Sequence, residues 1–176
     1  MSERAPSLPR LLAGVGEPPT TSLDGHLSLH GPLPDLGRGS NGQLIETVAR
    51  SGLRGRGGAS FPVATKLRAV ASRRWHKVVL ANGAEGEPAS KKDRVLMREV
   101  PHLVLDGVAV AAAAVGARDA VVAVARDDQR SLRSLEQAIH DRERARVSGR
   151  PVSLLAVPPR YITGQETALV NLVNTG

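Results

Sequence analysis

Ala120-Val-Val-Ala-Val-Ala125 is the stretch that decides the fold, because it is apolar at every position and ends at a charged turn. Two further short runs, Val78-Val-Leu-Ala81 and Val152-Ser-Leu-Leu-Ala-Val157, have the same character. Runs of this kind are typical of strands that are buried on both faces of a sheet. Because helical patterns separate them, the sequence predicts an α/β fold, a parallel β-sheet with helices on both faces.

Start and stop signals place the helices between these strands. Ser40-x-x-Gln43 has the pattern of a capping box, and Gly52 is placed to end the helix that follows. Pro62 suits the first turn of a second helix, and Asp127 or Asp128 suits the cap of a long one. The helices predicted in this way cover residues 40–51, 62–72, 94–99, 101–116, 128–149 and those from about 165 onward.

Residues 1–39 differ from the rest in composition, since they are rich in Pro, Gly and Ser with Leu at no regular period. We expect an extended arm over 1–39 that wraps on the core or is partly disordered, followed by one α/β domain over 40–176. The N-terminus lacks the apolar core of a signal peptide, and the longest apolar run, 103–117, is too short to span a bilayer. We therefore expect a cytoplasmic protein without membrane insertion.

The positive charge is concentrated in one segment. The chain of 176 residues has a net charge of +7, and residues 50–77 contain eight Lys or Arg and no acidic residue. A local positive field at a glycine-rich loop suits a ligand that carries phosphate. Nucleic acid is less favoured, because Phe61 is the one aromatic residue within the loop, and an arginine-rich solvated surface is the remaining alternative.

The sequence contains no cysteine. This excludes a disulfide scaffold, a thiolate zinc site and an iron–sulfur cluster held by cysteines of this sequence. His76 and His102 have no cluster of further ligands around them in the sequence, so we expect both to be structural and expect no metal site.

The glycine loop, Gly55-Arg-Gly-Gly-Ala-Ser-Phe-Pro62, carries the densest functional signal. Consecutive glycines allow backbone N–H groups to turn toward one point, and a helix that begins at Pro62 directs its positive end there. The loop follows a helix rather than a strand and has no Gly-Lys-Ser/Thr, so it is neither a dinucleotide fingerprint nor a Walker loop. A phosphate-binding loop and a structural glycine-rich turn both remain open.

Five motifs in this order resemble a known family. They are Ser51-Gly-Leu-Arg-Gly-Arg-Gly-Gly-Ala-Ser-Phe-Pro62, Asn82-Gly-Ala-Glu-Gly-Glu-Pro88, Lys92-Asp-Arg94, Pro101-His-Leu103 and Tyr161-Ile-Thr-Gly-Gln-Glu-Thr-Ala-Leu169. Together they look like the flavin-carrying, 51-kDa-type subunit of NADH:quinone oxidoreductase, respiratory complex I, in a stand-alone branch. The resemblance covers about residues 40–170 and implies hydride transfer from NADH to FMN, with no catalytic side chain required.

The resemblance also implies roles for individual residues. Those implied to bind FMN are Gly55, Arg56, Gly57, Gly58, Lys66, Asn82, Glu85, Gly164, Gln165 and Glu166. Those implied to bind NADH are Phe61, Glu87 and Tyr161. The electron acceptor is expected to be an iron–sulfur centre in a partner or in a further cluster domain, and the protein is expected to be peripheral to a membrane complex.

Each residue also has a simpler interpretation. Phe61 fits a core position, Lys66 fits a solvent-facing position, and Tyr161 fits an anchor for a proline turn. Glu85 and Glu87 fit a solvated acidic loop or, less well, a magnesium site. The sequence departs from the family at Ala84, where Asp is usual, and at Gln165, where Glu is usual. Because the sequence stops at Gly176, we expect either part of a longer protein or a natural short form. The alternative function is a module that binds flavin or nucleotide without turnover.

Overall fold

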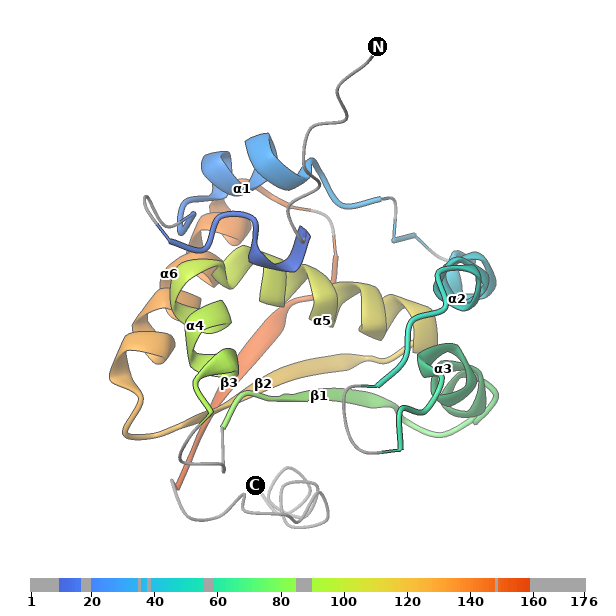
Figure 1. Cartoon of the computed structure of the whole chain (residues 1–176). Coiled ribbons are helices and arrows are strands. Elements are labelled where there is room, and N and C mark those ends of the chain that lie inside the picture. The colour runs from blue at the N-terminus through green and yellow to red at the C-terminus, as the bar shows by residue number, and fades with distance from the viewer. Residues whose placement is uncertain are drawn as a thin grey trace.

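The computed structural model describes residues 10–16, 20–34, 36–37, 39–55, 59–84, 90–147 and 149–158. Its centre is a parallel sheet with the strand order β1-β2-β3 (Figure 1). The strands are β1 (Val78–Asn82), β2 (Asp119–Ala125) and β3 (Val152–Val157), and each coincides with a predicted apolar run. The α/β fold and its parallel sheet are therefore confirmed.

Six α-helices and one short 3-10 helix are found among the described residues. They are η1 (Arg10–Leu12), α1 (Leu23–His30), α2 (Asn41–Arg50), α3 (Val63–Ala71), α4 (Lys92–Glu99), α5 (Pro101–Val115) and α6 (Gln129–Arg144). None of the helices in the described part of the chain is long and apolar enough to cross a membrane. The helix predicted from about residue 165 lies outside the described residues.

The main core lies between the sheet and the helices α5 and α6. One face of β2, formed by Ala120, Val122 and Val124, is buried against side chains of both helices. Figure 1 shows α4, α5 and α6 on this side of the sheet. The opposite face carries a smaller apolar cluster that includes Leu80 and Val157. Apolar side chains on both faces explain why the strand sequences do not alternate between polar and apolar residues.

The helices α2 and α3 pack at the C-terminal end of α5, around Ile45, Ala64 and Ala114. Lys77 joins this region to the sheet, because its Nζ donates hydrogen bonds to the carbonyl oxygens of Ala71 (2.7 Å) and Val115 (2.9 Å). Carbonyl groups at helix C-termini lack partners within the helix and carry partial negative charge, so a lysine there satisfies both helices at once.

Gly52 ends α2 with a φ of +66°, as predicted, and Gly116 ends α5 in the left-handed region with a φ of +67°. The predicted capping box is wrong, because Ser40 makes no side-chain cap hydrogen bond and its Oγ donates instead to the carbonyl oxygen of Gly37 (2.8 Å). The predicted end of α6 near residue 149 is also wrong. That helix stops at Arg144, since Arg146 adopts a φ of +51° that a right-handed helix cannot accommodate.

The described part of the arm predicted over 1–39 is not extended throughout. Leu23–His30 form α1, which begins at Ser22, whose Oγ accepts a hydrogen bond from the N–H of Gly25 (3.2 Å). This helix contacts α5 and α6. The sequence lacks a regular apolar period here because α1 is held partly by the buried polar residue His26.

A buried polar cluster connects α1, α5 and α6. His26 Nε2 lies 2.9 Å from Asp106 Oδ2, and Arg142 donates to the other oxygen of Asp106 and to the carbonyl oxygen of His102 (3.2 Å). The His102 ring is fully buried, and neither ring nitrogen has a hydrogen-bond partner among the described residues. Burial, with smaller contributions from Arg142 and His26, lowers the pKa of His102 from 6.5 to about 4, although Asp141 and Asp106 oppose the shift.

This lowered pKa predicts that acid weakens the fold. Between pH 6.5 and about 4 the unfolded chain takes up a proton at His102 that the folded chain does not, so the free energy of unfolding falls across this window. His102→Leu should flatten that part of the stability profile, measured by urea unfolding at a series of pH values. His140→Leu, on the exposed face of α6, should leave the slope unchanged, and an equal effect of both variants would contradict the assignment.

Asp128 caps α6 and connects it to α4. Its carboxylate accepts hydrogen bonds from Ser131 Oγ (2.7 Å), from the N–H of Ser131 (3.2 Å) and from Arg98 (2.6 Å). Burial raises the pKa of Asp128, but the hydrogen bonds from Ser131 and Arg98 outweigh it, so the net pKa lies below the ordinary value of 3.8. The carboxylate is thus held in its charged form at the end of β2.

Asp128→Ala should lower the free energy of unfolding by about 2 kcal/mol at neutral pH, because it removes a cap and leaves Arg98 unpaired. Asp127→Ala, at the exposed neighbouring position, should change it by less than about 0.5 kcal/mol. The contribution of Asp128 is present above the ordinary aspartate pKa and is lost as the pH falls below it. The difference between wild type and Asp128→Ala should therefore shrink in acid, and a difference that stays constant would refute this account.

Candidate functional site

The glycine loop is closed at its base like a small hairpin. Arg54 and Pro62 form an antiparallel bridge, the N–H of Gly55 donates to the carbonyl oxygen of Phe61 (2.8 Å), and the N–H of Val63 donates to that of Leu53 (3.0 Å). The N–H of Gly55 is therefore engaged within the loop, so it does not point at a ligand as the glycine pattern suggested. The predicted site residues Arg56, Gly57 and Gly58 lie outside the described residues.

Arg54 and Ser60 hold the second half of the loop, an arrangement that the sequence did not predict. Arg54 Nε donates to the carbonyl oxygen of Ser60 (2.8 Å) and lies 3.3 Å from Ser60 Oγ. Ser60 has a φ of +43°, an uncommon conformation for a residue with a side chain. Uncommon backbone conformations that neighbouring groups hold in place are often found in binding loops.

Phe61 and Lys66 form a pair on the surface beside this loop. The Phe61 side chain is 44% exposed, which shows that it is not a core residue. Lys66 lies one turn into α3, and its Nζ is 5.7 Å from the centre of the Phe61 ring. An exposed aromatic ring with an ammonium group over it offers a surface for stacking and a positive charge at the same place.

Several other cations of the basic segment serve the fold instead. Arg68 pairs with Glu46 on α2 (2.6 Å), and Lys77 binds two helix C-termini. The guanidinium of Arg73 lies 6.0 Å from the centre of the Trp75 ring. These three cations therefore have partners within the protein, whereas Lys66 and Arg54 lie at the loop itself.

Asn82 stands where the parallel strands end. It is exposed at the last position of β1, in register with Ala123, and its Oδ1 accepts a hydrogen bond from the N–H of Ala84 (3.1 Å). The Asn82 amide nitrogen has no hydrogen-bond partner among the described residues. The carboxyl edge of a parallel sheet is where ligands bind in such folds, and this amide has donors available for one.

The chain turns sharply after Asn82 and is held close to β2. The N–H of Gly83 donates to the carbonyl oxygen of Ala123 (2.8 Å), and a Cβ on Gly83 would lie 3.0 Å from that oxygen and 2.6 Å from Met97 Sδ. Ala84 is 7% exposed and packs among Ala123, Val157 and other apolar side chains. An aspartate at position 84 would place a carboxylate in this apolar cluster at a desolvation cost, so the surroundings favour alanine.

The remaining predicted site residues are Glu85, Glu87, Tyr161, Gly164, Gln165 and Glu166, which lie outside the described residues. Among the described ones, the structure brings Gly55, Phe61 and Lys66 together at the loop and places Asn82 at the sheet edge. No hydrogen bond, ion pair or cation–π contact joins these two groups within the described ranges.

No group of three or more His, Cys, Asp or Glu residues suited to a metal ion occurs in the described part of the chain. His76 instead pairs with Asp119 at 2.5 Å on the surface, and His102 is buried in the polar cluster described above.

Residues 48–176 match the Nuo51 FMN-binding domain family. The chain therefore belongs to this family, the FMN-binding domain of 51-kDa-type oxidoreductase subunits. It is 40% identical over 105 residues to an NADH-quinone oxidoreductase subunit of Rhizobium meliloti, a match covering 59% of this chain and 25% of the relative. It is 33% identical over 151 residues to a subunit of the ion-translocating oxidoreductase complex of Pseudomonas aeruginosa, covering 86% and 18%.

Two solved structures are similar to this chain. The NAD⁺-reducing [NiFe]-hydrogenase in its H₂-reduced state matches with a TM-score of 0.70 and 28% identity, over 97% of this chain and 28% of the other. The air-oxidised state matches with a TM-score of 0.69 and 30% identity, over 93% and 27%. The chain thus spans about a quarter or less of the length of the two bacterial relatives named above.

The close approach at Gly83 can be tested directly. Gly83→Ala should lower the free energy of unfolding by about 1–3 kcal/mol, because the new methyl group meets backbone as well as the Met97 side chain. Gly107→Ala is the matched control, since Gly107 is a helical position with nothing within 4 Å of a new Cβ. It should raise stability by up to about 1 kcal/mol in thermal unfolding. Neutral behaviour of Gly83→Ala would show that β1 and β2 are not so closely joined here.

Proposed function

We propose that this chain binds FMN and serves as the domain in which NADH reduces it, as part of an oxidoreductase that passes electrons to an iron–sulfur centre. The observation that carries the proposal is the match to the FMN-binding domain family over residues 48–176. The exposed Phe61–Lys66 pair beside the glycine loop and Asn82 at the sheet edge support it.

The described residues fit a flavin nucleotide. A planar ring needs apolar or aromatic surface together with hydrogen-bonding groups at its edge, and a phosphate needs positive charge. The ammonium group of Lys66 and the available amide of Asn82 supply the charge and the hydrogen-bonding group, while the exposed ring of Phe61 is proposed below to stack on NADH. The internal hydrogen bond of the Gly55 N–H removes one donor, so phosphate binding would rest on Lys66 and on the loop residues Arg56, Gly57 and Gly58.

In this proposal, Lys66 neutralises negative charge on the bound nucleotide, and Asn82 orients the ring by donating from its amide nitrogen. Gly55 and Ala84 line the site through close backbone approach, without a side chain that could accept a hydrogen bond. Glu85, Gly164, Gln165 and Glu166 are proposed to complete the cofactor contacts. When bound, FMN supplies the redox chemistry, since its ring accepts a hydride at N5 and releases electrons one at a time.

The substrate side of the site is proposed to be formed by Phe61, Glu87 and Tyr161. Phe61 offers an exposed face on which NADH could stack, and a carboxylate at Glu87 could orient the nicotinamide amide. Their contribution is to position NADH, because hydride transfer needs alignment and no general base.

The partners are proposed from the family and from composition. The sequence contains no cysteine, so an acceptor cluster with cysteine ligands would lie in a partner chain or in another part of a longer protein. Relatives are named as subunits of an NADH-quinone oxidoreductase and of an ion-translocating oxidoreductase complex. We propose a corresponding place for this chain, on the cytoplasmic side and peripheral to such a complex.

A second candidate is a module that holds flavin or nucleotide without turnover. Two observations favour it: Ala84 is buried among apolar side chains in place of an acceptor, and the N–H of Gly55 is engaged within its own loop. Both reduce the number of groups available to the cofactor. Flavin that is retained but not reduced by NADH would identify this second function.

Titration of FMN into the purified chain, followed by flavin fluorescence, tests binding, and anaerobic addition of NADH, followed by flavin absorbance, tests reduction. Lys66→Ala should weaken FMN binding about tenfold, because a charge-assisted contact is lost. Glu87→Ala should leave FMN affinity within about twofold and raise the NADH concentration needed for half-reduction about tenfold.

Arg130→Ala is the control, since this arginine lies exposed on α6. It should change neither FMN affinity nor reduction. If FMN does not bind at all, the proposed function fails. If it binds equally to wild type, Lys66→Ala and Arg130→Ala, the cofactor assignment of Lys66 fails while FMN binding stands.

A further inference from the structure

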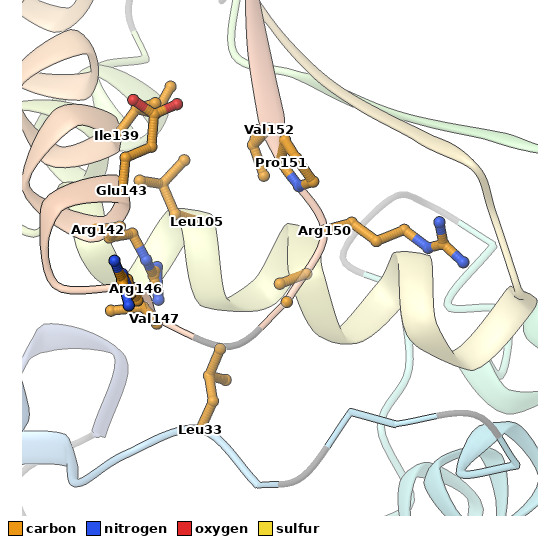
Figure 2. Close-up of a pocket in the computed structure, with 12 residues that line it drawn as sticks. Leu33, Leu105, Ile139, Arg142, Glu143, Arg146, Val147, Arg150, Pro151 and Val152 are labelled. Carbon is orange, nitrogen blue, oxygen red and sulfur yellow. The ribbon is translucent and has the colours of Figure 1, made fainter.

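A separate pocket lies where β3 begins, away from the carboxyl edge that carries Asn82. It has a volume of about 140 Å³ and is enclosed by α5, the C-terminal part of α6 and the segment that follows α1 (Figure 2). Its walls are largely apolar, formed by Leu33, Leu105, Ala109, Ile139 and Val152. The arm, two helices and a strand thus meet around one hollow.

Two arginines line the same side of this pocket. Arg142 is anchored, because it donates to Asp106 and to the carbonyl oxygen of His102. A guanidinium has five N–H groups, so donors remain after these two contacts. Arg146 is exposed and has no ion pair or side-chain hydrogen bond with any described residue. Figure 2 shows both guanidinium groups on the same side of the hollow, next to Val147.

The local charges favour an anion at this position. The nearest carboxylate that lines the pocket is Glu143, and Figure 2 shows it directed toward Ile139 and away from the two guanidinium groups. Asp106 is already shared between His26 and Arg142. Arg146 therefore adds a positive charge beside Arg142 that no described side chain neutralises, and a bound anion would relieve the repulsion between them.

We propose that this pocket binds a small organic anion, a carboxylate on an apolar body about the size of a benzene ring. The apolar walls would take the ring, and Arg142 and Arg146 would take the carboxylate. The size follows from the volume of about 140 Å³, since an apolar protein cavity of about 150 Å³ accommodates benzene. A guanidinium is well matched to a carboxylate because it can donate two parallel hydrogen bonds.

The site is independent of the proposed flavin function. It lies at the amino end of β3, whereas Asn82 marks the carboxyl end of β1, and all three strands run parallel. Occupancy would connect Leu33 in the arm to α5, α6 and β3 through one ligand. Because a ligand that binds the folded state stabilises it, the bound anion should raise the unfolding temperature of the chain.

Benzoate is the probe, and benzamide is its neutral counterpart of the same shape. Titration is followed by NMR of labelled Ile, Leu and Val methyl groups. Benzoate should shift the resonances of Leu105, Ile139 and Val152 saturably and leave Leu80, on the opposite face of the sheet, unchanged. Benzamide should bind about tenfold more weakly, because it carries no charge for the arginines.

Three variants complete the test. Arg146→Gln should weaken benzoate binding about tenfold and remove most of the preference over benzamide. Arg150→Gln is the matched control, because Arg150 borders the pocket but its side chain extends away from it in Figure 2, and it should stay within about twofold of wild type. Ala109→Leu should fill the hollow and abolish binding, with folding checked by circular dichroism.

The proposal is overturned if benzoate causes no saturable shift at the lining methyl groups. It is also overturned if benzamide binds as tightly as benzoate, or if Arg146→Gln and Arg150→Gln have equal effects. These outcomes are distinct from the flavin experiment, since Lys66 and Glu87 take no part in them.

Discussion

The packing of α5 on β2 is the interaction on which the rest of the structure depends. Ala112 is fully buried in α5, as is Val124 on the facing side of β2, and small side chains allow the helix to lie close to the sheet. The C-terminal end of α5 supports α2 and α3, and therefore the glycine loop between them, through the cluster around Ala114. Its N-terminal half carries His102 and Asp106, to which α1 and α6 attach. One helix thus sets the relative positions of the loop, the strand ends and the arm.

The candidate flavin site combines two kinds of support. The loop of Phe61 is held by backbone hydrogen bonds and by Arg54, so its shape follows largely from local contacts. The position of Asn82 follows from the sheet, since β1 ends in register with Ala123 while β2 and β3 continue to Ala125 and Val157. A ligand that contacts both Phe61 and Asn82 would join a loop shaped by local hydrogen bonds to a strand end whose position is set by the sheet. Membership of the FMN-binding domain family agrees with such a ligand, because a flavin nucleotide has both a phosphate and a ring to hold.

The polar cluster near the amino end of β3 is held together by contacts between side chains rather than by the backbone of a loop or sheet. Asp106 contacts both Arg142 and His26, so each of these polar side chains has a partner within a largely apolar region. The same arrangement anchors Arg142 in the lining of a pocket that Arg146 also lines. The arm is held here by specific polar contacts rather than by an apolar stripe, which is why its sequence looks irregular although part of it is helical.

The sequence by itself determined the three strands, most helix starts and the family, because apolar runs, proline, glycine and ordered motifs act through local geometry and composition. Val152–Val157 was predicted with its observed bounds, and Pro62 and Gly52 mark helix boundaries as expected. Only the tertiary structure decided that α1 forms and that Lys77 and Arg68 serve the fold. Each of these depends on a partner that is chosen when the chain closes on itself, so no period or motif in the sequence specifies it.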